Sequence, residues 1–129
     1  MGKRDGERGA VAVELAFLLP VLLLILIGSM EYGRVFHVQN SLTHAAREGA
    51  RNAAIHWDEP AKLNVSGAAL QGTSLVGLGV AVSSNVASCA PGRNVTVTTS
   101  VTLPSMSGFL PPGLFPIKLK GEAVMRCGG

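Results

Sequence analysis

The sequence predicts an α+β fold in which one long N-terminal helix packs on a small antiparallel sheet of about three strands. An apolar run, Ala10–Met30, is followed by apolar residues at spacings of three and four as far as about His56, the pattern of a helix with one buried face. Near the C-terminus, Asn94–Leu103 and Ile117–Arg126 instead alternate between the two faces of a strand, which is the period of half-buried strands.

The apolar run is long enough to cross a membrane. A helix rises ~1.5 Å per residue, so about 20 residues cover a hydrocarbon core of ~30 Å. Lys3, Arg4 and Arg8 precede the run. Because positively charged flanks tend to remain in the cytoplasm, we expect the N-terminus inside the cell and the remainder of the chain outside the cytoplasm.

Glu14 is the only charged residue in the apolar run. A lone carboxylate in hydrocarbon is costly and therefore needs a partner. Cleavage after Gly9 would make Ala10 a new N-terminus, one helical turn from Glu14. In an array of staggered helices, that ammonium of one subunit would neutralise Glu14 of its neighbour. The pair needs both charges, because breaking a buried ion pair costs several kcal/mol.

Four blocks of residues occur in order near the N-terminus: Arg8–Glu14, Leu18–Pro20, Glu31–Arg34 and Ala45–Arg51. Together they resemble the TadE-like family, whose members are small pseudopilins of the tight-adherence branch of type IV pilus machines. The resemblance is close over roughly the first 55 residues and loose over the remainder. One departure is Leu15, which stands where the family commonly has an aromatic residue and bears on the efficiency of cleavage.

The resemblance implies a pilin-like fold and cleavage between Gly9 and Ala10 by a prepilin peptidase. It implies subunit assembly through Ala10 and Glu14, and a minor pilin or pseudopilin acting in pilus assembly, initiation or adhesion. The implied partners are the peptidase, other pilin or pseudopilin subunits, the pilus assembly platform and the membrane. The implied location is the cytoplasmic membrane, or the pilus at the cell surface after extraction.

Two other interpretations of the N-terminus stay open. In the first, the run is a secretory signal peptide; however, Met30 would then precede the cut where a small residue is required, and the run exceeds the roughly 7 to 15 residues of such a signal. In the second, the chain is an uncleaved membrane anchor that docks on a secretion or pilus machine, with Glu14 near the membrane surface.

The helix is predicted to continue beyond the membrane with a narrow face of alanine and glycine, suited to close packing on a small domain or on neighbouring helices. Pro20 removes an amide donor and is either a bend point or a tolerated membrane proline. Pro60 disfavours helix at the residue before it, so the long helix is expected to end near Trp57. The expected organisation is a leader at 1–9, a transmembrane helix at 10–30, its extracytoplasmic continuation at 31–57 and a small domain at 58–129.

Within the small domain we expect a short helix at about Ala61–Gln71 and a strand within Leu78–Val86, before the two clearer strands. The loop Pro104–Pro116 contains four prolines and is an apolar candidate for partner contact, or packs on its own sheet. Cys89 and Cys127, the only cysteines, both fall on the side where a disulfide is permitted. A disulfide between them would contribute ~3 to 4 kcal/mol to the stability of the domain in the chain-entropy model. The alternative is two unpaired thiols.

Other classes of function have weaker support. The net charge of +3 is spread along the chain without a basic cluster among aromatics, so we expect no nucleic-acid partner. A third hypothesis, a small envelope enzyme with a metal at His37, His44 and Glu48, is disfavoured because seven helical residues separate the histidines by ~10 Å, against ligand bonds near ~2 Å. No nucleophile or phosphate-binding motif is present, so we expect no catalytic residues, metal or cofactor.

Overall fold

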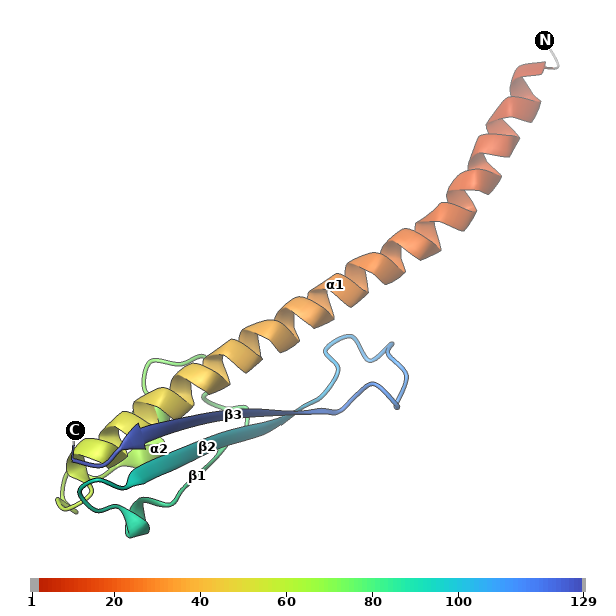
Figure 1. The fold of residues 1–129 in the computed structure, drawn as a ribbon. Helices are drawn as coiled ribbons and strands as arrows, with labels where there is room; N and C mark the ends of the chain where they lie inside the picture. The colour runs from red at the N-terminus through yellow and green to blue at the C-terminus, as the bar shows by residue number, and fades with distance from the viewer. Residues whose placement is uncertain (1–2, 129) are drawn as a thin grey trace. The chain divides into compact units, whose positions relative to one another are not determined.

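The structure, a computed structural model, describes residues 3–128, with side chains for residues 6–128. It has the predicted α+β arrangement of one long N-terminal helix and an antiparallel sheet of three strands (Figure 1). The chain divides into two compact units, Met1–Arg34 and Val35–Gly129, which are described separately. The elements are α1 (Lys3–His56), α2 (Val65–Leu70), β1 (Ala81–Ser84), the 3-10 helix η1 (Val86–Ser88), β2 (Asn94–Leu103) and β3 (Ile117–Arg126).

Three of the predicted elements end where the sequence places them. Helix α1 ends at His56, and β2 and β3 have the predicted bounds. Helix α1 begins earlier than expected, at Lys3, so residues 3–9 of the predicted leader continue the same helix. The spacing of apolar residues therefore predicts the end of α1 and both ends of β2 and β3 well, because in these segments the apolar spacing continues as far as the helix or strand itself.

Two elements are shorter than predicted. Helix α2 starts only at Val65 because Asn64 caps it: its Oδ1 accepts a hydrogen bond from the Gly67 amide at 2.9 Å, which satisfies one of the free donors of the first turn. Strand β1 is limited to Ala81–Ser84. It ends because Asn85 turns the chain into η1, while its Oδ1 accepts from the Thr96 amide at 2.7 Å.

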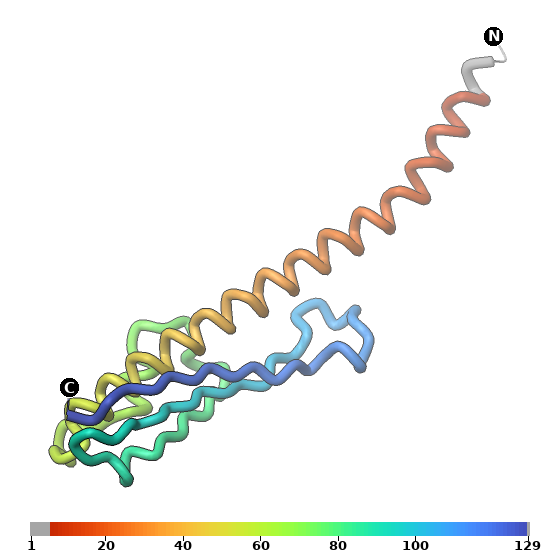
Figure 2. The backbone as a smooth tube through the Cα atoms, viewed as in Figure 1, coloured from red at the N-terminus to blue at the C-terminus, as the bar shows by residue number. Residues whose placement is uncertain are grey.

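The sheet has the order β1-β2-β3, and both neighbouring pairs are antiparallel. Side chains of β2 alternate between the buried and the solvent face, as predicted for a half-buried strand. Its buried positions are Val95, Val97, Thr99, Val101 and Leu103. In Figure 2 the yellow part of α1 runs alongside this sheet, so that the helix covers one face of it.

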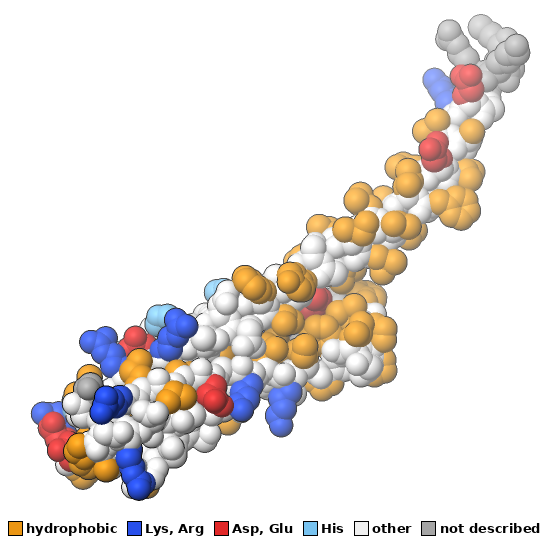
Figure 3. Space-filling view, viewed as in Figure 1, with side chains coloured by type: hydrophobic (Ala, Val, Ile, Leu, Met, Phe, Trp, Pro, Cys, Tyr) orange, Lys and Arg blue, Asp and Glu red, His pale blue; other side chains and the backbone are white. Residues whose placement is uncertain are grey.

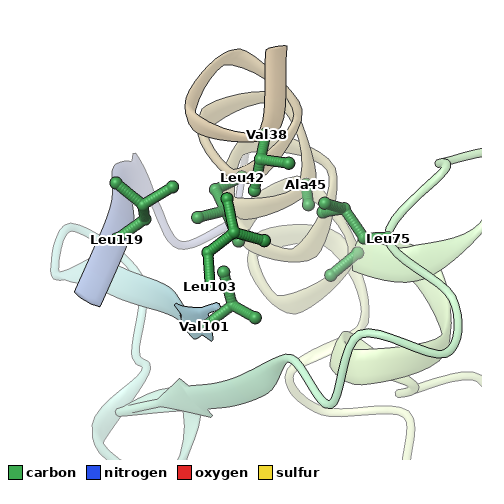
Figure 4. Close-up of a cluster of buried hydrophobic side chains, with 8 residues drawn as sticks. Val38, Leu42, Ala45, Leu75, Val101, Leu103 and Leu119 are labelled. Carbon is green, nitrogen blue, oxygen red and sulfur yellow. The ribbon is translucent and has the colours of Figure 1, made fainter. Parts of the chain in front are cut away.

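The core lies between α1 and the sheet and is divided into two clusters. In the first, side chains of α1, β2, β3 and the segment after α2 point toward one another (Figure 4). The second surrounds the end of α1 and contains Ala50, Ala53, Val95 and both cysteines. Leu42, Ala45, Ala46 and Ala50 are fully buried, so the small-residue face of α1 packs on the chain's own sheet, the first of the two partners expected for it.

Candidate functional site

The apolar part of α1 is exposed along its whole length within its own unit. The most apolar window of the helix has a mean hydropathy of 2.8 and buries none of its residues in the structure. Its large side chains face outward on all sides; Phe17 is 76% exposed and Leu24 is 69% exposed. A helix that is apolar all round is stable only when another apolar phase surrounds it. By length and composition, this helix can span a membrane.

Glu14 lies on this surface, exposed and continuously helical with Ala10. Glu14 is four positions after Ala10, which corresponds to about one turn and ~6 Å along the axis. Both residues are therefore presented on one side of the helix. Val13 and Leu15 flank Glu14 and are themselves 58% and 60% exposed, so the carboxylate stands in an apolar setting. The arrangement can accept one cationic partner from outside the helix.

Pro20 lies inside α1 without ending it. A proline at this position has no amide to donate to the carbonyl of Ala16. Next to it, a shallow apolar groove is lined by Leu15, Leu18, Leu19, Val21, Leu22 and Ile25. The groove offers contact area to lipid or to another helix. The role of Pro20 as a bend point stays a prediction.

Helix α1 and strand β3 touch at a point that the sequence analysis did not identify. A Cβ added to Gly121 would lie 2.5 Å from the backbone C and O atoms of Leu42, so only glycine fits there. Opposite Gly121 in the register is Thr99, which is fully buried and donates its hydroxyl to the Leu42 carbonyl at 2.8 Å. Gln39 also donates to the Lys120 carbonyl at 2.8 Å. These contacts set the position of the sheet along α1.

Cys89 and Cys127 are joined by a disulfide with a Cα–Cα distance of 5.8 Å. Both are buried in the second core cluster. The adjacent amide of Gly128 donates to the Ala54 carbonyl at 3.0 Å, and the Cys127 amide donates to the Arg93 carbonyl at 2.8 Å. The C-terminus is thereby tied to the end of α1 as well as to the start of the sheet region.

The histidines of the enzyme hypothesis lie on a polar surface. His37 and His44 line an open depression together with Asn40, Ser41, Gly72, Thr73 and Ser74, and Glu48 is not among the lining residues. The ring Nε2 of His37 lies 3.2 Å from the Ser74 hydroxyl. Among residues 3–128, no group of three or more His, Cys, Asp or Glu side chains is placed to hold a metal ion. The structure does not bring the three residues of that hypothesis together.

Comparison with known proteins returns one family. Residues 9–51 match the model of the family described as TadE-like protein. The resemblance seen in the sequence is thus confirmed over this segment. The match begins at Gly9, the residue of the predicted cut, and ends at Arg51, an exposed residue five positions before the end of α1 at His56.

No curated protein and no solved structure matches the chain. The TadE-like segment and the long apolar helix together fit a membrane component associated with a tight-adherence pilus. The TadE-like family is a structural pilus component and is not known as a family of enzymes. A helix able to span a membrane near the N-terminus is consistent with a single-pass protein of the inner membrane.

Proposed function

We propose that this chain is a minor pilin or pseudopilin of a tight-adherence pilus machine, cleaved between Gly9 and Ala10 and acting in pilus assembly, initiation or adhesion. The observation that carries the proposal is the family match, which starts at Gly9 and includes Glu14 as the single charge of the apolar run Ala10–Met30. The leader 1–9 stays in the cytoplasm, where positive flanks are retained. The domain beyond the helix stands outside the cytoplasm.

Cleavage changes the electrostatics of assembly. Before the cut, Glu14 has no matching positive charge at Ala10, because the Ala10 nitrogen is a neutral amide. After the cut, the new ammonium of one subunit meets the carboxylate of Glu14 in the next, and each charge removes the cost of burying the other. The peptidase therefore makes an assembly-competent subunit, and the adjacent helices pack through the apolar surface on both sides of Pro20.

The mature N-terminus tests this proposal. We would sequence the N-terminus and measure the intact mass of the protein from its native envelope, and from a strain that lacks the prepilin peptidase. The proposal expects a start at Ala10 that disappears without the peptidase, and a Gly9→Leu variant that accumulates at precursor size. A start at the initiator in both strains would leave the alternative, an uncleaved bitopic component that docks on a secretion or pilus machine.

Glu14→Gln then separates assembly from processing. The amide keeps the shape of the side chain and removes its charge, so the variant should insert in the membrane and mature normally while its incorporation into the pilus machine falls. The matched control is Glu48→Gln, which lies in the same helix outside the apolar run. Normal incorporation of Glu14→Gln would exclude the ion pair as the basis of assembly.

A further inference from the structure

We propose that the loop between β2 and β3, residues 104–116, is a second membrane contact, whose tip inserts in the outer surface layer of the bilayer that α1 spans. The inference rests on the membrane anchorage in the proposed function and is independent of cleavage at Gly9. The occupant of this loop surface is lipid. A partner protein and a second copy of the chain are the competing occupants.

The composition of the loop differs from that of an ordinary surface loop. It contains no charged residue between Pro104 and Pro116. Large apolar side chains nevertheless point outward: Phe109 is 82% exposed, Leu114 62% and Met106 58%. Contiguous exposed apolar surface of this kind marks contact with a protein or a membrane. Figure 3 shows hydrophobic side chains gathered over the loop end of the domain, with one acidic side chain beside them, and most of the charged side chains of this face toward the opposite end.

The position of the loop favours the membrane. Its two ends, Leu103 and Ile117, face each other across the strand pair and pack with Val35 and Val38 of α1. Val35 follows the end of the apolar run at Met30 by five residues, which is ~8 Å of helix. The headgroup layer on each side of the hydrocarbon is about 5 to 7 Å thick. A helix segment of this length is about as long as that layer is thick. Within its own unit, the loop projects from the end of the sheet away from the C-terminus (Figure 2).

The first charge after the loop has the sign that suits lipid headgroups. Lys118 is exposed on the outer face of β3, two residues beyond Pro116. The next outward residue, Lys120, pairs with Glu122 at 3.2 Å. An apolar tip followed by a lysine on a flexible stem resembles the arrangement by which amphipathic segments sit at a membrane surface, with apolar groups in the acyl boundary and cations at the phosphates.

A tryptophan placed at the loop tip reports its surroundings. Trp57 is the only tryptophan, so the full-length chain would carry Trp57→Phe as background. Phe109→Trp then places the probe in the loop, and Val124→Trp is the matched control, because Val124 is 55% exposed on the outer face of β3 and pairs with Thr96 near the start of β2. Both variants would be reconstituted in phosphatidylcholine and phosphatidylglycerol vesicles, with and without lipids brominated in the upper acyl chain.

The proposal expects blue-shifted emission and loss of intensity with brominated lipid for Phe109→Trp, and neither effect for Val124→Trp. The loss should not change as the protein is diluted with lipid. Equal, water-like emission of both variants would overturn the proposal, as would a signal that disappears on dilution, which indicates a second copy. Flotation with the vesicles is scored first: a chain that does not float refutes the anchorage itself, whereas floating protein with an unquenched loop refutes only this inference.

Discussion

Gly121→Ala tests the contact that positions the sheet on α1. The added methyl group would lie 2.5 Å from the C and O atoms of Leu42 and 2.8 Å from the amide nitrogen of Thr43. All three atoms belong to helix backbone, so no side chain can rotate away and the strand must move instead. Overpacking of a core typically costs about 1 to 3 kcal/mol, and a rigid neighbour puts this site at the upper end, ~3 kcal/mol.

The cost converts to a shift in melting temperature. For a domain of the size of Val35–Gly129, each kcal/mol moves the midpoint by about 4 to 8 °C, so we expect a fall of roughly 12 to 24 °C. Thermal unfolding of the full chain in detergent would be followed by the fluorescence of Trp57, which packs against the second core cluster. The control is Gly113→Ala, because no atom lies within 4 Å of the added carbon. Equal melting temperatures of the Gly121→Ala and Gly113→Ala variants would refute the reasoning.

Three further predictions use the same melting assay. Gly49→Ala should cost about 1 kcal/mol, less than the strand variant, because its new carbon meets Val97 Cγ1 at 3.1 Å, Ala69 Cβ at 3.2 Å and the Val65 carbonyl oxygen at 3.3 Å, which are longer contacts than those of Gly121; a larger loss than that variant would contradict the structure. Thr99→Val should lower the free energy of unfolding by about 1 to 2 kcal/mol, because it removes the buried hydrogen bond to the Leu42 carbonyl. Thr102→Val, at an exposed position, should change that free energy little; equal effects of the two variants would argue against the bond. Cys127→Ser should lose about 4 kcal/mol in the chain-entropy treatment, given a sequence separation of 38; an unchanged melt would mean that the bridge adds nothing.

The blocks of residues that resemble the TadE-like family have different surroundings in the structure. Within Ala45–Arg51 the small residues are buried: Ala45, Ala46 and Ala50 have no exposed surface. Arg47 and Arg51 in the same block are exposed. The alternation of small and charged residues therefore reflects a helix that lies close on its own sheet with one face in solvent. By contrast, the residues around Gly9 and Glu14 are exposed, and among the described residues 6–26 every one is exposed as well, which agrees with the outside partner we propose for this block.

Sequence patterns predicted best those features that depend on one segment alone. The period of two in β2 and β3 located both strands, because each residue's exposure there follows from the pleat of its own strand. The capped helix α2 was predicted too long, since the cap at Asn64 depends on a side chain reaching a particular amide. Strand β1 was also predicted too long, because the turn at Asn85 is stabilised by a residue on another strand, Thr96.

By itself, the sequence determined the membrane-length helix, the lone carboxylate at Glu14, the two long strands and the family resemblance, all of which are properties of composition and period along one segment. Only the tertiary structure decided that Gly121 meets the backbone of Leu42 and that Thr99 donates to the same residue. The physical reason is that such contacts depend on the register between segments distant in the chain. That register follows from the packing of both faces together, which no single segment encodes.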